Sequence, residues 1–455
     1  MRWWLLVPLI AIRTSSAETT WPGFRGDGTN RTGAAEIPLT WQPTQGIAWR
    51  SRLAGYGQSS PVIFGDRVFV TSVEGSQKEH CVLQCFTLQS GRLEWQRSIA
   101  ASQLGLNNPS VSRASSTPVV DGERVYGFFE SGNLVALSHA GDILWTRSLT
   151  TEFGKFQNHH GLASSLAQTA KAVVVLVEHR GDSYLIACEK TSGATLWKTP
   201  RKSGLSWASP VAASFAGRDC VVVSSNGDLT LYDAATGDSL ATLDGLYGNL
   251  IPSPVVSGDR IFVGAGEGGL MSDIGRAAQS NCCVRVTPNG PGYDLDVLWR
   301  CEKAVGHHAS PVIADGHVYL TTKVGVLFCF DLDTGEQRYV KRLDDPCWAT
   351  PLATPGRLYC FGKNGVTTVI RTGLTYERIA TNPLWDEDDL ARRNQDAGHR
   401  PENQFPKLPE QGRAQMEEML REAVGEVVYA AAAVNGTLLI RTGTELIAIR
   451  EVDRE

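Results

Sequence analysis

The stretch SSPVIFGDRVFV (59–70) holds the pattern that decides the fold, and close variants return as SSTPVVDGERVYG (115–127) and ASPVIADGHVYL (309–320). Each copy has a small residue and a proline, an apolar stretch, a turn with Gly and a second apolar stretch. A third stretch, another Gly turn and usually a Trp follow. The proline position falls at Pro61, Pro118, Leu166, Pro210, Pro254, Pro311, Pro351 and Ala432. Successive positions are 40–57 residues apart, except for a final step of 81.

Each repeat has room for four short strands. In the sixth repeat the candidate strands are 310–314, 317–322, 326–332 and 337–343, and the turns between them contain Gly, which supplies the positive φ of tight hairpins. One four-stranded unit exposes two apolar faces and two edges, so we expect it to be unstable alone. A ring of such units buries the faces against their neighbours. The sequence therefore predicts an all-β fold, an eight-bladed β-propeller with four-stranded antiparallel blades.

The two ends of the repeat array complement one another. Segment IAWRSRL (47–53) resembles an outer strand, with Trp49 in the place that Trp95 takes in the next repeat, but no inner strands precede it. At the other end, three strands are expected without a fourth, at 427–434, 437–442 and 445–451. We expect the N-terminal strand to complete the last blade and close the ring, which makes 47–455 a single propeller domain.

Two segments precede the first repeat. Residues 1–17 have a charged start, a short apolar core and a small-residue end, which is typical of a cleaved signal peptide. The apolar core is too short to span a bilayer, and a retained anchor is the alternative. Residues 18–46 are a Gly-rich loop segment, which we expect to pack on the propeller through Trp21, Phe24 and Trp41.

A third segment explains the long final step. Residues 382–426 form an insertion between blades 7 and 8, and part of it has apolar residues at helical spacing: Met416, Met419, Leu420, Ala423 and Val424. We expect a helix that packs on the rim of the ring or docks a partner.

The composition is that of an ordinary globular protein. The 455 residues carry a net charge of −5 and show no basic stripe, which argues against a nucleic-acid partner. Together with the predicted signal peptide, this indicates an exported monomer in the periplasm or cell envelope, with no transmembrane span. Among the ten cysteines, the adjacent Cys282 and Cys283 are either a strained vicinal disulfide or two alternating residues of a strand.

Propeller geometry locates a candidate binding site. The inner strand of each blade lines the central channel, and the residue three positions before the proline lies where the chain enters that strand. This position and its neighbours place the following residues at one mouth of the channel: Gln58, Arg113, Ser115, His160, Trp207, Asn249, His308, Trp348 and Tyr429. Aromatic rings, imidazoles and amides around a concavity are typical of a binding site, although they can equally serve only to fill the channel.

The sequence points to no reaction centre. It contains no GxSxG, P-loop or HExxH motif. The pairs His159–His160 and His307–His308 would each offer at most one metal ligand on a strand, because adjacent strand residues point to opposite faces. No acidic or Cys partner stands at a fixed spacing from them. We assign no catalytic residue and no metal ligand.

The outer-strand stretches SGRLEWQRSI (90–99), AGDILWTRSL (140–149) and SGATLWKTP (192–200) resemble the repeat of PQQ-like (pyrroloquinoline-quinone) β-propellers. That repeat is shared by quinoprotein dehydrogenases and by BamB, a non-enzymatic scaffold of outer-membrane β-barrel assembly. The opening WPGFRGDGTNRTG (21–33) is similar to exported bacterial proteins of this family that are abundant in planctomycetes. The resemblance covers Trp21 to Arg450.

Resemblance to the enzymes implies PQQ at the channel mouth, calcium held by Glu, Asn and a catalytic Asp, and a vicinal disulfide against the cofactor. No catalytic Asp motif matches a position here, and Cys282 and Cys283 fall in the third strand of blade five, away from the mouth. Resemblance to BamB implies rim loops that bind partners, although no Cys for lipid attachment follows the predicted signal.

We therefore expect an exported, non-catalytic scaffold or binding protein without a cofactor, whose partner is a protein, a peptide or a cell-surface glycan. The alternative is a PQQ- and calcium-dependent oxidoreductase that acts on an alcohol or a sugar.

Overall fold

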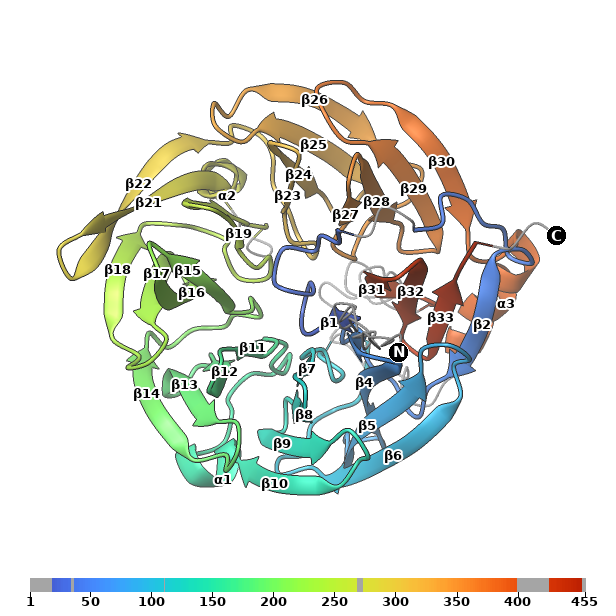
Figure 1. Cartoon of the computed structure of the whole chain (residues 1–455), viewed down its shortest axis with the longest axis horizontal. Coiled ribbons are helices and arrows are strands. Elements are labelled where there is room, and N and C mark those ends of the chain that lie inside the picture. The colour runs from blue at the N-terminus through green and yellow to red at the C-terminus, as the bar shows by residue number, and fades with distance from the viewer. Residues whose placement is uncertain (1–18, 34–36, 110, 268–272, 399–424, 452–455) are drawn as a thin grey trace, which may run out of the picture.

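The computed structural model describes residues 19–33, 37–109, 111–267, 273–398 and 425–451. The predicted signal peptide (1–17) and the predicted helix at 416–424 lie outside these ranges. The described chain forms eight antiparallel sheets arranged in a ring, with the inner strands around the axis and the outer strands at the rim (Figure 1). The predicted eight-bladed propeller is confirmed.

The strands of blades 1 to 4 follow the chain from the axis outward. Blade 1 has β3 (Val62–Phe64), β4 (Arg67–Glu74), β5 (His80–Thr87) and β6 (Leu93–Ala100); blade 2 has β7 (Val119–Val120), β8 (Arg124–Phe128), β9 (Asn133–Ser138) and β10 (Ile143–Ser148). Blade 3 has β11 (Ala167–Gln168), β12 (Ala172–Val177), β13 (Ser183–Glu189) and β14 (Thr195–Arg201); blade 4 has β15 (Val211–Phe215), β16 (Arg218–Ser225), β17 (Asp228–Asp233) and β18 (Ser239–Asp244).

Blades 5 to 7 repeat the same order. Blade 5 has β19 (Val255–Ser257), β20 (Arg260–Val263), β21 (Cys282–Asn289) and β22 (Gly292–Arg300); blade 6 has β23 (Val312–Ala314), β24 (His317–Thr321), β25 (Val326–Asp331) and β26 (Gln337–Arg342). Blade 7 has β27 (Leu352–Thr354), β28 (Arg357–Phe361), β29 (Val366–Arg371) and β30 (Arg378–Pro383). In the part of the chain that the structure describes, three helices occur in the loops: α1 (Leu149–Phe153), α2 (Ile274–Ser280) and α3 (Glu387–Gly398).

Blade 8 closes the ring as predicted. Its first three strands are β31 (Val428–Val434), β32 (Thr437–Thr442) and β33 (Glu445–Ile449), and its outer strand is β2 (Ile47–Arg52) from the N-terminal part of the chain. The register places Trp49 opposite Ala448. The hydrogen bonds of a finished sheet therefore join the two ends of the array, which removes the gap that an open ring would leave.

Outer-strand tryptophans hold five of the eight blades to the blade that follows. The indole N–H of Trp95 in blade 1 donates to the His139 carbonyl of blade 2 (2.9 Å), and Trp49, Trp145, Trp197 and Trp299 make the same bond to the blades that follow theirs. A Cβ on Gly141 would lie 2.7 Å from the Trp95 ring. The repeat thus needs its second Gly because a neighbouring indole covers that turn.

A ring of hydroxyl groups explains the small residue before each proline position. The backbone N–H of this residue donates to the hydroxyl of its counterpart in the next blade. The bonds run in order from Ser60 to Thr117, Ser165, Ser209, Ser253, Ser310 and Thr350, at 2.8–3.1 Å. In blade 8 the counterpart is Ala431, which has no hydroxyl.

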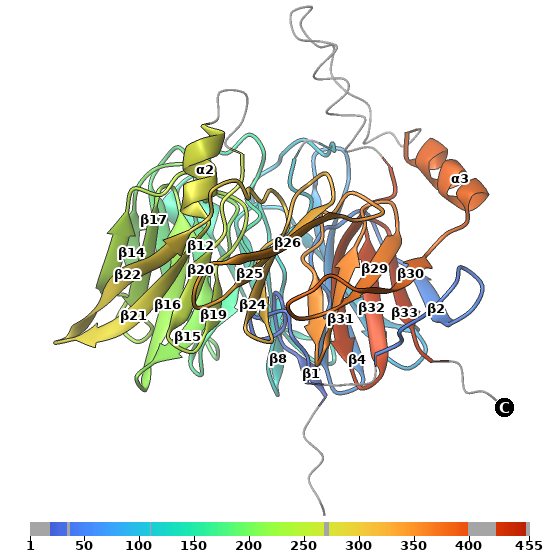
Figure 2. The same cartoon turned by 90° about the horizontal axis from the view of Figure 1, so that it is seen from above.

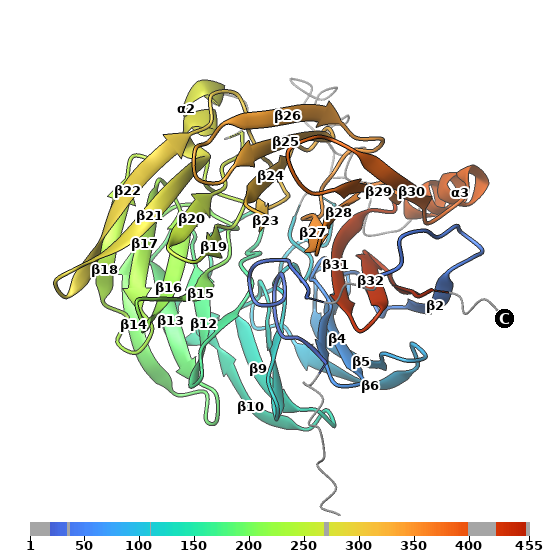
Figure 3. The ribbon, with the colours of Figure 1, turned by 45° about the horizontal axis from the view of Figure 1, so that its top comes forward.

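The N-terminal segment crosses the axis on the side away from the predicted mouth (Figures 1 and 3). Its first strand, β1 (Thr20–Trp21), pairs with β3 as an unpredicted fifth strand of that sheet. Pro22 then accepts a hydrogen bond from the Val120 N–H of blade 2, and Asn30 donates to the Pro351 carbonyl of blade 7 (2.6 Å). Of the three expected anchors, Trp21 and Trp41 are buried, whereas Phe24 is half-buried.

The loops that precede the inner strands lie on the other side of the ring. Figure 2 shows α2 and α3 on one side and β1 on the opposite side. Helix α3 rests on blade 8, where Arg393 pairs with Glu445 of β33 at 2.8 Å. The helix thus lies within the predicted insertion, whose first two residues belong to β30.

Candidate functional site

Eight of the nine predicted residues precede the inner strands of their blades, and Tyr429 lies within the inner strand β31. Seven of them are half-buried, and Arg113 and Asn249 are fully buried. They form groups that are linked by contacts between neighbouring blades.

The first group joins blades 1, 2 and 8. Oε1 of Gln58 accepts hydrogen bonds from the Arg113 N–H (2.9 Å) and the Ser115 hydroxyl (2.5 Å). The Arg113 guanidinium lies 3.4 Å from the centre of the Tyr56 ring, and the Tyr56 hydroxyl meets that of Tyr429 at 2.9 Å. The sequence missed Tyr56, which connects the four predicted residues of this group.

Arg441 of β32 lies beneath this group and links blade 8 to blade 1. Its Nη1 donates to the Ser59 carbonyl (3.0 Å) and its Nη2 to the Thr71 carbonyl (2.5 Å). Burial lowers the pKa of Arg441 to about 9, and the nearby Tyr56 and Tyr429 oppose this shift. One buried arginine therefore holds the last blade to the first, beneath the first group.

The second group lies on blades 3 and 4. The rings of His160 and Trp207 are 5.9 Å apart and nearly perpendicular, and the indole of Trp207 donates to the Gly161 carbonyl at 2.8 Å. The His160 carbonyl accepts from the Ser112 N–H at 2.7 Å, which links this group to the first.

The third group lies on blades 6 and 7. The rings of His308 and Trp348 are 4.6 Å apart, and Nζ of Lys363 lies 4.9 Å from the centre of the Trp348 ring. Burial, together with the charges of His307, Lys323 and Lys363, lowers the pKa of His308 to about 3. His308 is therefore a neutral, aromatic surface at physiological pH.

Asn249 does not line the mouth. Its Oδ1 accepts from the Gly227 N–H, and its Nδ2 donates to the Asp228 carbonyl and the Ser224 hydroxyl, at 2.9–3.1 Å. The side chain thus holds the turn between β16 and β17, and only its loop belongs to the mouth.

The two histidine pairs differ from expectation in one respect. Their rings lie side by side, 4.1 Å apart in His159–His160 and 4.2 Å in His307–His308, because these residues are in loops rather than strands. The argument from strand alternation was therefore wrong for them. Within the described ranges, no group of three His, Cys, Asp or Glu side chains is arranged to hold a metal ion.

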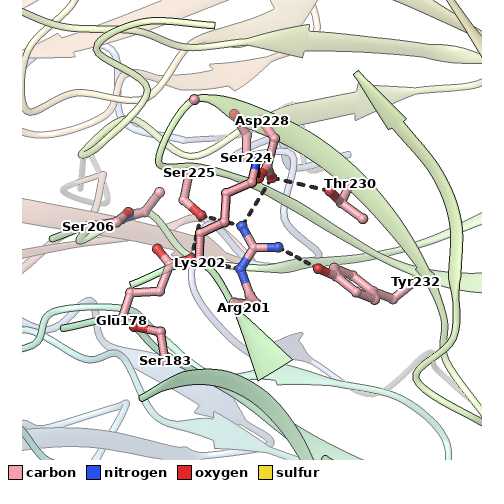
Figure 4. Close-up of polar contacts among 12 residues, drawn as sticks. Glu178, Ser183, Arg201, Lys202, Ser206, Ser224, Ser225, Asp228, Thr230 and Tyr232 are labelled. Atoms are coloured by element: carbon pink, nitrogen blue, oxygen red, sulfur yellow. Dashed lines mark hydrogen bonds and ion pairs between the residues drawn. The ribbon is translucent and has the colours of Figure 1, made fainter. Parts of the chain in front are cut away.

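Beside the second group, a buried ionic network that the sequence did not predict joins blades 3 and 4 (Figure 4). Nε of Arg201 donates to Glu178 (2.7 Å), and Nη2 donates to Asp228 (3.1 Å). The side chains of these three residues are 1–6% exposed. Although burial opposes it, the charges of Glu178, Tyr232 and Asp228 raise the pKa of Arg201. The partners come from different strands of two blades, so no local spacing signals them.

The adjacent cysteines do not fit the vicinal pair of a quinone site. Cys282 and Cys283 are free thiols in β21, the third strand of blade 5. Cys282 packs in the core between blades 4 and 5, and Cys283 in the core between blades 5 and 6. Their side chains therefore point to opposite faces of the sheet, and the pair does not face the mouth.

Comparison with known proteins agrees with this architecture. The family described as "Outer membrane protein assembly factor BamB" matches residues 32–181, 181–275 and 294–399, so the chain belongs to that family of β-propellers. A relative named outer membrane protein assembly factor BamB, from Moranella endobia, is 24% identical over 199 residues, which cover 44% of this chain and 46% of the relative.

Two solved structures share the fold. BamB from Moraxella catarrhalis superposes with a TM-score of 0.56 at 12% identity, covering 90% of this chain and 98% of that one. The quinohemoprotein alcohol dehydrogenase ADHIIG from Pseudomonas putida HK5 superposes with a TM-score of 0.59 at 10% identity, covering 96% and 82%. The chain spans about half the length of the curated relatives that it matches. Of the described helices, none has both the length and the apolar character needed to cross a membrane.

Proposed function

We propose that this protein is an exported, non-catalytic scaffold of the cell envelope, which binds another protein through the mouth of its propeller and the loops around it. Membership of the BamB family supports a scaffold role. The opening segment, which resembles exported planctomycete proteins, is consistent with export to the periplasm.

One observation supports the proposal: five half-buried aromatic side chains lie at or before the start of the inner strands of five blades. They are His160, Trp207, His308, Trp348 and Tyr429. Aromatic residues are enriched at the centres of protein interfaces, since they bury a large area at little cost in side-chain entropy. Each of them is held by its neighbours, so the surface is ordered before any partner binds.

Two carboxylates in this region, Glu178 and Glu130, are engaged in ion pairs, which is in keeping with a binding role. Glu178 is held by Arg201, and Glu130 by Lys78 at 3.0 Å. A general acid or base must have a proton-transfer partner among the reacting atoms, whereas these two carboxylates are engaged in buried ion pairs.

Photo-cross-linking in the producing cells tests the proposal. The photoreactive residue p-benzoylphenylalanine replaces Trp207 or Trp348 at the mouth and, as a matched control, the exposed Leu374 in the turn between β29 and β30. We expect a discrete protein adduct from the mouth positions and none from Leu374. Adducts of equal yield from all three positions, or a glycan as the only adduct, would contradict a protein-binding mouth.

A further inference from the structure

A pocket lies beside the mouth, where blades 1 and 2 meet the loop after α1. Its volume is about 270 Å³, and apolar side chains form most of its wall: Val73, Leu104, Leu106, Val111, Phe156 and Leu162. Leu104 and Leu106 are 53% and 63% exposed, which is unusual for two leucines this close together in one loop.

The loop that carries these leucines is paired along one edge only. The N–H groups of Gly105 and Asn107 donate to the carbonyls of Gln77 and Ser76 at 3.0 and 3.1 Å. Leu104 and Leu106 alternate with these two residues in the sequence, and their peptide groups take no part in this pairing. Within the described ranges, no main-chain hydrogen bond is formed by Leu104 or Leu106.

The floor of the pocket offers no free charge. Nζ of Lys78 binds Glu130 at 3.0 Å and also donates to the Ser112 carbonyl, and Glu130 accepts from the Ala114 N–H. Both charged side chains are at most 7% exposed. The pocket is therefore suited to an apolar group rather than to an ion.

We propose that this pocket and the edge of Leu104–Leu106 bind an extended segment of a partner polypeptide, which adds a short strand and inserts one large apolar side chain. An unpaired strand edge next to an apolar pocket is the arrangement that strand addition requires, because the main chain supplies affinity and the pocket supplies selectivity. The exposed Lys155 precedes Phe156 in the chain, and the backbone N–H of the exposed Arg180 donates to the Gln157 carbonyl. These two cations favour an acidic residue in the partner segment, next to its apolar anchor. This inference rests on the proposed scaffold function.

Defined peptides test the pairing directly. The probes are fluorescein-labelled nine-residue Ser/Thr peptides with one Asp and with Phe, Leu or Ser at the central position, titrated with the full-length protein by fluorescence anisotropy. We expect the Phe and Leu peptides to bind at least tenfold more tightly than the Ser peptide. Methylation of alternate amide nitrogens, which prevents strand pairing, should weaken binding to a similar extent.

Substitutions at exposed positions keep the test independent of folding. Leu106→Ser should weaken the Phe peptide about tenfold, since one apolar contact is lost. Leu374→Ser removes a leucine of matching exposure (61%) in another turn and should have no effect. Equal binding of the Phe and Ser peptides, insensitivity to N-methylation, or equal losses in both variants would overturn the inference.

Two further outcomes would assign the pocket to another occupant and so overturn the inference. One is a dimer in light scattering that Leu106→Ser dissociates, which would make a second copy of the chain the occupant. The other is tighter peptide binding after deletion of residues 399–424, which would make that segment the occupant. Photo-cross-linking at Trp207 and Trp348 reports on the mouth, whereas the peptides report on this pocket. A protein adduct at the mouth together with no peptide binding would overturn this inference and leave the proposed scaffold function intact.

Discussion

The backbone N–H of Ser60 donates a 2.9 Å hydrogen bond to Oγ1 of Thr117 in the next blade. Five more bonds of this kind carry the ring as far as Thr350. Each of the five residues between Ser60 and Thr350 therefore makes two such bonds: its backbone N–H donates to the next blade, and its hydroxyl accepts from the preceding blade. This linkage fixes where the inner strands begin, and so it fixes the positions of the mouth loops.

Thr117→Ala should lower the free energy of unfolding by about 1–3 kcal/mol, because it leaves the buried Ser60 N–H without an acceptor. Urea denaturation measures the change. Thr117→Ser, which keeps the hydroxyl, is the control and should cost less than about 1 kcal/mol. Equal losses in the two variants would mean that the methyl group matters more than the hydrogen bond.

Gly141→Ala should be more destabilising than Gly356→Ala. Both glycines have positive φ, +86° and +74°, so both variants incur about 1–2 kcal/mol of backbone strain. Only at Gly141 would the new Cβ meet an indole, 2.7 Å from Trp95, which adds about 1–3 kcal/mol of overpacking. Thermal or urea unfolding measures the difference in stability between the two variants, which reports on the contact between the blades. Identical stabilities would refute the predicted clash with Trp95.

Arg201→Met should cost about 3–5 kcal/mol of unfolding free energy, since Glu178 and Asp228 would remain buried without their cation. Arg371→Met is the matched control, because its ion pair with Glu377 has the same 2.7 Å distance but is solvent-exposed. That variant should cost at most about 1 kcal/mol. The double variant Arg201→Met/Glu178→Met should recover part of the loss.

His308→Gln should reduce the dependence of stability on pH. The pKa of His308 is about 3 in the folded protein, and that of an unfolded histidine is about 6.5. Between these values the unfolded chain binds more protons, so the stability of the wild type falls as the pH falls. His308 contributes at most about 2 kcal/mol of this loss between pH 7.5 and pH 5. Urea midpoints at the two pH values measure the effect, and the same pH dependence in the variant and the wild type would contradict it.

Titration with PQQ and calcium tests the enzymatic alternative. Because Cys282 and Cys283 face separate cores, we expect no binding of PQQ at micromolar concentration, with or without calcium. Saturable binding followed by reduction of an acceptor dye with an alcohol or a sugar would contradict the scaffold function. Isothermal calorimetry and dye reduction provide the two measurements.

The repeat predicts which residues occupy equivalent places in adjacent blades. Once Pro61 and Pro118 are aligned, Gln58 and Ser115 must lie at equivalent places in adjacent blades, and the structure joins them through Gln58 Oε1. The depth of each side chain could not be predicted in this way. Asn249 was expected at the surface but is buried, because its side-chain amide bonds to the β16–β17 turn of the preceding blade, a contact that no repeat position signals.

The sequence alone determined the number of blades, the strands within them and the closure by Trp49, because these follow from a periodic pattern that local chemistry imposes on every repeat. Only the tertiary structure decided the features that occur once: the bonds of Arg441 to Ser59 and Thr71, the place of Arg201 between Glu178 and Asp228, and the pocket beside Leu104 and Leu106. Each of these depends on residues that are distant in the chain. No repeat encodes them, and they arise from the way in which adjacent blades pack.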